Sequence, residues 1–167
     1  MVNKALFSST KQDWQTPKVL YDKIDKGAGG ILIDAAADET NHQCDLWYGP
    51  GSNITEDALS FDWIKGKTHF LNPPFKGIEK WYQKCALEAE RGITTFMLTP
   101  ARCDTRYFHD HVPQWARRIW ILKGRVPFVG GKYTSTFPTL IIQWSNADPW
   151  APLAWYFWDW RNENMPC

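Results

Sequence analysis

An asparagine, two prolines and a phenylalanine follow a short apolar run in the sequence "THFLNPPF". The side-chain oxygen of Asn72 and the backbone carbonyl of Pro73 are hydrogen-bond acceptors. Proline fixes φ and lacks an N–H group, so Pro73 and Pro74 add no competing donors, and Phe75 adds a flat apolar face. Two acceptors beside an aromatic ring suit a planar ligand with an exocyclic amino group. A plain Pro-Pro turn between a strand and a helix accounts for the same residues equally well.

An exocyclic amine of this kind is a poor nucleophile, because its lone pair is delocalised into the ring. Acceptors that take both of its hydrogens would draw the nitrogen toward a tetrahedral geometry and aim the lone pair at an electrophile. The protein would then act chiefly by positioning, which lowers a barrier by ~7–11 kcal/mol when the geometry is right. On this interpretation, which the tetrapeptide supports no more than it supports a plain turn, the site would transfer a group to an amine nitrogen.

A carboxylate, Asp34, ends another apolar run, "GGILID". An acid at this place suits hydrogen bonding to a ligand ammonium or to ribose hydroxyls. The following "AAADETN" lacks the glycine-rich turn that brings backbone amides close to a pyrophosphate. A nucleoside cofactor without phosphates therefore fits better than a dinucleotide or a nucleoside triphosphate. The alternative role for Asp34 is a helix cap.

The elements that position these residues follow from apolar periodicity. A helix is predicted at 16–27, where Thr16 can cap it and Pro17 suits the first turn, and a second helix at 78–92. Short apolar runs predict strands within 29–37, 44–49, 67–75, 93–100, 117–125 and 138–144.

Alternating strands and helices predict an α/β fold with a mostly parallel sheet, helices on both faces and an antiparallel edge hairpin formed by 117–125 and 138–144. In such sheets, ligands bind beyond the carboxyl ends of the strands. Asp34, Asn72 and Thr99 lie at such ends, so three independent features predict one site.

Length and composition bound the class of protein. With 167 residues, a single domain over 1–167 is expected, with a short N-terminal arm at 1–12 and a Trp-rich tail at 148–167. No apolar run approaches the ~20 residues of a membrane span, and no signal-peptide pattern is seen. The four cysteines are widely spaced without a C-x-x-C pair, which favours reduced thiols and disfavours a zinc ribbon. We therefore expect a cytoplasmic protein without membrane insertion.

Basic residues are concentrated in one segment, although the net charge of the chain is only +1. Residues 91–132 contain eight Lys and Arg but two Asp and Glu, a local charge of +6. Such a segment is either a nucleic-acid-binding surface or an ordinary solvated face. The tail beyond Pro149 carries four of the eleven tryptophans. Its alternation predicts another edge strand, whose aromatic residues pack in a core or a dimer, or stack on unpaired bases.

The ordered set of segments resembles the phage-type N6-adenine DNA methyltransferases that use S-adenosylmethionine, from about Asp13 to Trp144. "DWQTP" resembles their N-terminal cofactor-side motif, "IDAAADETNHQC" their first-strand motif, and "EDALSFDW" the segment whose acid faces the cofactor adenine. "NPPF" resembles the catalytic motif of amino-methyltransferases, and "TPARCDTRYFHDHV", "LKGRVPF" and "FPTLIIQW" follow in the family's order. The resemblance implies a Rossmann-like S-adenosylmethionine methyltransferase fold.

The resemblance also implies roles for single residues. Asn72 and Pro73 would accept hydrogen bonds from the target amine, Pro74 would hold the turn, and Phe75 would stack on a target base flipped out of the duplex. The reaction would be direct displacement at the sulfonium methyl, without a metal. The implied cofactor-binding residues are Trp14, Thr16, Pro17, Asp34, Ala35, Ala37 and Asp57. The alternative for Trp14 is a core aromatic, and for Asp57 an exposed loop acid.

No segment is long enough to form a separate target-recognition domain, so base choice is expected from loops at 102–115 and 126–137. Arginine suits contacts to both phosphates and bases. Ordinary surface charge is the alternative role for each basic residue. The candidates for DNA binding are Arg102, Arg106, Lys123 and Arg125.

The expected activity is transfer of a methyl group to N6 of adenine in DNA, as a phage-encoded modification that protects against restriction. The same Asn-Pro-Pro-aromatic geometry would also serve cytosine N4, an RNA adenine or a protein glutamine. The basic segment favours a nucleic acid among these. A catalytically silent DNA-binding module is a further alternative. The recognition sequence and the oligomeric state stay open.

Overall fold

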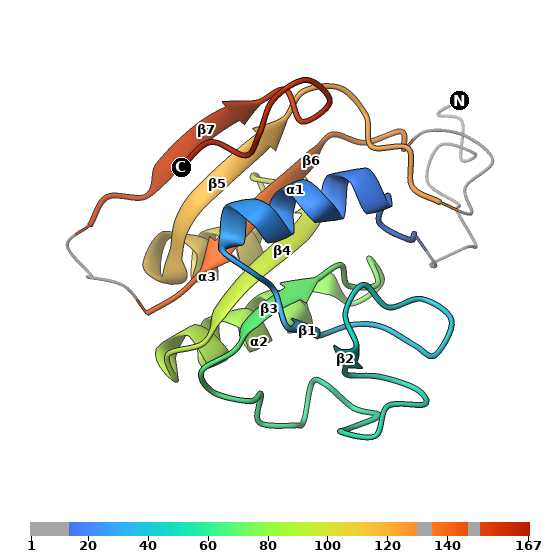
Figure 1. The fold of residues 1–167 in the computed structure, drawn as a ribbon. Helices are drawn as coiled ribbons and strands as arrows, with labels where there is room; N and C mark the ends of the chain where they lie inside the picture. Colours follow the sequence, from blue (N-terminus) through green and yellow to red (C-terminus); the bar gives the residue numbers. More distant parts are fainter. Residues whose placement is uncertain (1–13, 130–134, 147–150) are drawn as a thin grey trace, which may run out of the picture.

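The structure is a computed structural model that describes residues 14–129, 135–146 and 151–167. Its helices and strands are labelled in Figure 1. In chain order they are α1 (Lys18–Ala28), β1 (Ile33–Asp34), β2 (Leu46–Trp47), β3 (Thr68–Leu71), α2 (Ile78–Glu90), β4 (Thr94–Pro100), α3 (Arg106–Trp115), β5 (Ala116–Leu122), β6 (Thr139–Trp144) and β7 (Ala154–Trp158).

The strands form one seven-stranded sheet with the order β2-β1-β3-β4-β6-β5-β7. The pairs β1–β2, β1–β3, β3–β4 and β5–β7 are parallel, and β6 is antiparallel to both β4 and β5. All described strands except β6 therefore point the same way, and their carboxyl ends meet along one edge of the sheet, here called the rim. The predicted α/β fold with a mostly parallel sheet is confirmed.

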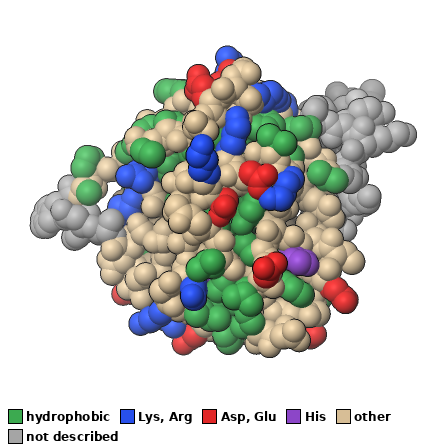
Figure 2. Space-filling view, in the orientation of Figure 1, with side chains coloured by type: hydrophobic (Ala, Val, Ile, Leu, Met, Phe, Trp, Pro, Cys, Tyr) green, Lys and Arg blue, Asp and Glu red, His purple; other side chains and the backbone are tan. Residues whose placement is uncertain are grey.

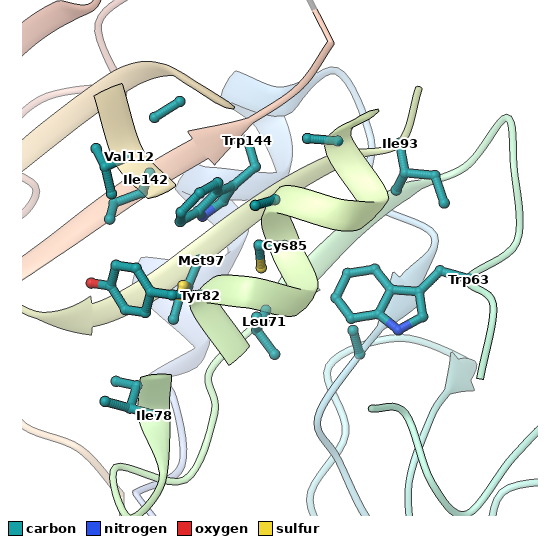
Figure 3. Close-up of a cluster of buried hydrophobic side chains, with 14 of the residues drawn as sticks. Trp63, Leu71, Ile78, Tyr82, Cys85, Ile93, Met97, Val112, Ile142 and Trp144 are labelled. Carbon is teal, nitrogen blue, oxygen red and sulfur yellow. The ribbon is translucent and has the colours of Figure 1, made fainter. Parts of the chain in front are cut away.

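The two faces of the sheet carry separate cores, because successive strand residues point to opposite sides. Phe70, Phe96 and Ile141 pack with α1 in one core, and their neighbours Leu71, Met97 and Ile142 pack with α2 and α3 in the other. Figure 1 shows α1 in front of the sheet, with α2 and α3 behind it. Figure 3 shows the second core, in which Tyr82 and Cys85 of α2 lie with Leu71 and Met97 of the sheet, and Trp63 lies beside the helix.

The antiparallel pair β5–β6 is present, but it lies one strand inside the sheet and not at its edge. The reason is β7, which pairs in parallel with the open side of β5. The predicted edge strand in the tail is thus confirmed, and it displaces the hairpin from the edge. Trp158 and Trp160 of the tail are buried in the same core as α1, which confirms internal packing for these two rings.

The predicted loop at 102–115 is wrong over most of its length, because α3 occupies Arg106–Trp115. Pro113 lies in the last turn of α3, and the apolar residues Phe108 and Val112 are buried four positions apart. In the loop predicted at 126–137, residues 130–134 lie outside the described part. No helix in the described ranges is both long and apolar enough to cross a membrane.

Helix α1 begins at Lys18, one residue later than it would if Thr16 were its N-cap. Pro17 occupies the N-cap position and no side chain caps the helix, so the predicted capping role of Thr16 is wrong. The Pro17 carbonyl accepts hydrogen bonds from the backbone of Leu20 and Tyr21. The helix ends at Gly29, whose φ of 76° is a left-handed conformation that favours glycine. The Thr16 hydroxyl is thereby left for a different contact.

Candidate active site

A cleft opens at the rim, beyond the carboxyl ends of β1 and β3. Its cavity volume is about 280 Å³, close to the lower end of the range for small-molecule sites. Among the residues that sequence analysis predicted, those lining the cleft are Trp14, Ala37, Asp57, Asn72, Pro73 and Pro74. The structure thus brings together residues that are up to 60 positions apart in the chain.

Other predicted residues lie next to the cleft without lining it. This group comprises Thr16, Pro17, Asp34, Ala35 and Phe75. The lining also contains residues that sequence analysis did not select, which are Ala36, Asp38, Asn41, Tyr48, Gly49, Pro50, Glu56, Ala58, Leu59 and Trp81. Most of them come from the long connection between β2 and β3, which shows no helical or strand periodicity.

The side-chain amide of Asn72 is held in one orientation. Its Nδ2 donates hydrogen bonds to the backbone carbonyl of Trp14 and to the hydroxyl of Thr16, the latter at 3.1 Å. A carbonyl can only accept, so the nitrogen of the amide must face Trp14 and the oxygen must face away. Within the described residues, this Oδ1 atom is buried and has no hydrogen-bond partner. Buried polar atoms are normally paired, so Oδ1 is an acceptor available to a ligand at the cleft.

Aromatic rings surround the Asn-Pro-Pro-Phe tetrapeptide. Phe75 stacks against Trp14, with 6.5 Å between ring centroids and 21° between planes. Phe75 and Phe137 pack edge to face, with 5.1 Å between ring centroids. Trp14 also contacts Phe128. Trp14 thus belongs to an aromatic cluster and also lines the cleft, and its contact with a cofactor stays a prediction. Stacking of Phe75 on a target base stays a prediction.

Asp34 turns its carboxylate away from the cleft and toward the loop that follows β1. The side chain is 4% exposed, and its oxygens accept hydrogen bonds from the backbone of Ala36 (3.4 Å) and Gln43 (3.0 Å). Burial raises the pKa of Asp34 to about 6, against the opposing effect of these two hydrogen bonds. The carboxylate thus fixes the loop that contributes Ala36 and Asn41 to the cleft. Its predicted contact with a cofactor stays a prediction.

Gly49 allows two loops of the cleft wall to approach each other. Its φ is +137°, and a Cβ atom at this position would lie 1.9 Å from the carbonyl oxygen of Ala37. The neighbouring Tyr48 carbonyl accepts a hydrogen bond from Ala37, and Gly49 donates one to Thr55. Only glycine fits here, because any side chain would force the segments apart. The sequence "GPG" marks a turn, but nothing in it specifies this contact.

Asp57 lies on the outer wall of the cleft, beside Glu56. Its carboxylate accepts hydrogen bonds from the backbone of Leu59 and Ser60 and from the Ser60 hydroxyl. The Ser60 hydroxyl and the Leu59 backbone amide hold the pKa of Asp57 below its usual value. The side chain is therefore an exposed, ionised acceptor that closes a turn. Its predicted contact with a cofactor adenine stays a prediction.

The predicted DNA-binding residues lie on the half of the rim beyond β4 and β5. Arg102, Arg106, Lys123 and Arg125 are all exposed, and none lines the cleft. Arg106 pairs with Asp110 and Lys123 with Asp159, at 3.8 and 2.8 Å.

The segment after Arg125 reaches the cleft side, because Val129 donates a backbone hydrogen bond to Gln15. On the face that carries α1, Lys and Arg side chains are interspersed with Asp and Glu (Figure 2).

The described residues contain no group of three or more His, Cys, Asp or Glu side chains placed to hold a metal ion.

Comparison with known proteins identifies the family. The family model described as DNA N-6-adenine-methyltransferase (Dam) matches residues 4–139, which include every residue lining the cleft. A DNA N-6-adenine-methyltransferase of Escherichia phage T1 is 31% identical over 108 residues, which are 65% of this chain and 44% of that protein. The chain thus spans less than half the length of that relative. Because the family model covers most of the chain, the protein belongs to the DNA N-6-adenine-methyltransferase (Dam) family.

Proposed function

We propose that the protein transfers a methyl group from S-adenosylmethionine to the N6 amine of adenine in DNA. The observation that carries this proposal is the orientation of Asn72, whose nitrogen is held by Trp14 and Thr16 while its oxygen is left without a partner in the described part of the chain. Family membership supports adenine as the base.

The role of Asn72 and Pro73 is to accept the two hydrogens of the target amine. Asn72 Oδ1 accepts a hydrogen bond from one N–H of the amine, and the Pro73 carbonyl accepts a hydrogen bond from the other. These two bonds draw the amine lone pair out of conjugation with the ring. Neither group needs to reorganise, because the amide is already fixed and Pro73 is buried at the cleft. Preorganised dipoles of this kind contribute strongly to transition-state stabilisation.

The cleft wall fits a nucleoside cofactor. When bound, S-adenosylmethionine supplies an electrophilic methyl group on a sulfonium sulfur. Glu56 and Asp57 offer carboxylates to its amino or hydroxyl groups, and Ala37 and Ala58 offer apolar surface to its ring. The loop after β1 holds its backbone amides on Asp34 and has no glycine-rich phosphate cradle, which agrees with a ligand that lacks phosphates.

The acceptor must reach the cleft as an unpaired base. In a duplex, the N6 amine of adenine is engaged in base pairing and stacked, so a methyltransferase has to flip the base out. Phe75 would stack on the flipped base, and the exposed cations beyond β4 and β5 would hold the phosphates nearby. The phage origin of the relative supports a role in modification of phage DNA.

The test is transfer of a labelled methyl group from S-adenosylmethionine to unmethylated DNA, followed by nucleoside analysis. We expect label in N6-methyladenine, and Asn72→Ala should lower kcat by about 10²–10³-fold, as expected for one lost transition-state hydrogen bond. Asn146→Ala is the matched control, because Asn146 lies at the opposite edge of the sheet and its amide donates to the Glu90 carbonyl. It should retain full activity.

Each other outcome identifies an alternative. Label in N4-methylcytosine would keep the mechanism and change the base. Label on RNA or on glutamine but not on DNA would overturn the substrate. Cofactor binding without any transfer would indicate a silent DNA-binding module and overturn the proposed activity.

A further inference from the structure

A continuous line of hydrogen bonds joins the end of β1 to the catalytic amide. Asp34 Oδ2 accepts from the backbone N–H of Gln43 at 3.0 Å, and the Gln43 side chain donates to the carbonyl of Thr16 at 3.2 Å. The Thr16 hydroxyl accepts from Asn72 Nδ2 at 3.1 Å. The line connects three separate segments of the chain and ends on the group proposed to bind the target amine.

Two members of this line are shielded from solvent. Thr16 and Asp34 are each 4% exposed, so their polar atoms depend on protein partners. The Thr16 hydroxyl does not cap α1, although it stands one residue before the N-cap position. It points instead to Asn72, and the carbonyl of the same residue is held by Gln43. Thr16 is thereby fixed by its backbone and contacts Asn72 through its side chain.

An Asn side chain offers two N–H donors and one oxygen. The Trp14 carbonyl takes one donor and the Thr16 hydroxyl takes the other. With both donors engaged, rotation of the amide about its Cβ–Cγ bond would break two hydrogen bonds. With the Thr16 hydroxyl removed, only the Trp14 contact would remain, and the orientation of Oδ1 would be held less firmly.

We propose that Thr16 is a positioning residue that directs Asn72 Oδ1 at the target amine, and that Gln43 and Asp34 hold Thr16 in place. The inference rests on the proposed function. Thr16 then contacts Asn72, the residue proposed to bind the target amine, instead of the cofactor. Asp34 acts indirectly, through Gln43 and Thr16, and this role needs no contact with the cofactor.

The test compares variants of Thr16 in the methyl-transfer assay. Thr16→Val removes the hydroxyl and keeps the shape, and should lower kcat about tenfold, the effect of ~1.4 kcal/mol, with little change in KM for S-adenosylmethionine. Thr16→Ser restores the hydroxyl and should restore kcat. Thr95→Val is the matched control, because the buried Thr95 hydroxyl has no hydrogen-bond partner among the described residues and lies at the other end of β4.

Gln43→Met extends the test along the line. It should lower kcat by about threefold in the otherwise unchanged protein and have no further effect in the Thr16→Val background, because coupled residues are non-additive. An unchanged kcat in Thr16→Val would overturn the proposal. So would equal loss in Thr16→Ser and Thr16→Val, since the methyl packing and not the hydroxyl would then matter.

A second readout separates this inference from the proposed function. The side-chain N–H resonances of Asn72, assigned from their loss in Asn72→Asp, report its hydrogen bonds without any substrate. Thr16→Val should shift one of the two resonances upfield and speed its exchange with water, whereas Thr95→Val should leave both unchanged. If wild-type protein methylates no DNA, the proposed function fails, and these resonances alone decide whether Thr16 orients Asn72.

Discussion

The rim has two halves that are built differently, an inner half beyond β1 and β3 and an outer half beyond β4 and β5. Beyond β1 and β3, the polar groups of Asp34 and Asn72 are buried and held by hydrogen bonds from neighbouring loops. Beyond β4 and β5, Arg102 and Arg125 are exposed cations on connecting segments. A buried polar group has one low-energy arrangement, whereas an exposed cation has many. The first half is therefore suited to place reacting atoms, and the second to attract a charged polymer.

The inner half depends on a charged network carried by α2. Glu88 is 1% exposed and accepts hydrogen bonds from the Trp63 backbone, from Lys84 and from Arg91. Lys84 also donates to the Phe61 carbonyl at 2.7 Å and lies over the Trp63 ring, and Trp63 in turn donates to the Ala58 carbonyl. Figure 3 shows Trp63 beside α2. The network thus ties the segment 58–63, which begins in the cleft wall, to the helix that follows the Asn-Pro-Pro-Phe tetrapeptide.

The largest effect is expected when this network loses its carboxylate. Glu88→Ala leaves Lys84 buried without its partner, and breaking a buried ion pair in this way lowers the free energy of unfolding by about 3–5 kcal/mol. Glu90→Ala is the control on the same helix, because Glu90 is exposed, and it should change that free energy by less than ~0.5 kcal/mol. Urea unfolding measures both. Equal effects of the two substitutions would show that the wall does not depend on Glu88.

The same network can be replaced as a unit. A Lys84→Met and Glu88→Leu double variant removes both charges and fills the space with apolar atoms, which is often neutral or stabilising compared with a buried pair. It should recover most of the stability that Glu88→Ala loses. Failure to recover would mean that the hydrogen bonds to the Phe61 and Trp63 backbone matter more than the charges.

A second prediction concerns two buried groups with opposite responses to pH. Burial raises the pKa of Asp34 to about 6, above its ordinary value of 3.8. The folded chain therefore binds this proton more readily than the unfolded chain, and folding gains stability as pH falls from 6 toward 3.8. Burial lowers the pKa of His69 from 6.5 to about 4. Neutral His69 must take up a charge in acid, so its stability contribution is lost as pH falls through 6.5 to 4.

Single substitutions should separate these opposing contributions, each on the order of 3 kcal/mol. Compared with wild type, Asp34→Asn should lose more unfolding free energy between pH 6.5 and pH 4, because the stabilising protonation is gone. His69→Gln should lose less over the same range. Urea unfolding at several pH values gives both differences. Parallel curves for wild type and both variants would contradict the assignment of these shifts to Asp34 and His69.

The inner half of the rim could be predicted only in part from the sequence. Asn72 and Asp34 end apolar runs, and strand ends meet at one edge of a parallel sheet, so their proximity followed from the pattern alone. The direction in which the Asp34 carboxylate points could not be predicted, because it depends on the hydrogen bond from the backbone amide of Gln43. In the wall at 49–59, Asp57 was selected from the resemblance of "EDALSFDW", whereas Gly49 and Pro50 were missed because this stretch has no periodicity. The need for Gly49 arises only from its approach to Ala37.

The outer half shows a different limit of sequence reasoning. The basic residues after β4 and β5 were found by counting charge, which requires no tertiary information. The helix α3 was missed because residues 102–115 were expected to be a loop that chooses the base, although Phe108 and Val112 have helical spacing and are buried. The position of the β5–β6 pair was misjudged because the pairing of β7 with β5 is a long-range contact.

The smallest effects are expected from the exposed cations themselves, and salt dependence distinguishes them from the inner residues. Changing Arg102, Arg106 or Arg125 singly to Gln should weaken DNA binding modestly and reduce the slope of log K against log[salt] by about 1, the signature of one lost phosphate contact. Lys123→Gln should reduce the slope less, since Asp159 pairs with Lys123 at 2.8 Å, closer than the 3.8 Å between Arg106 and Asp110. Arg118→Gln is the control, because Arg118 lies toward the opposite edge, where its side chain donates to Gln143, and the slope should not change.

At saturating DNA, kcat should stay at the wild-type value in all of these variants. A large loss of kcat in any of the four rim variants would mean that the outer half also places reacting atoms, and the division of the rim into an attracting and a reacting half would not hold.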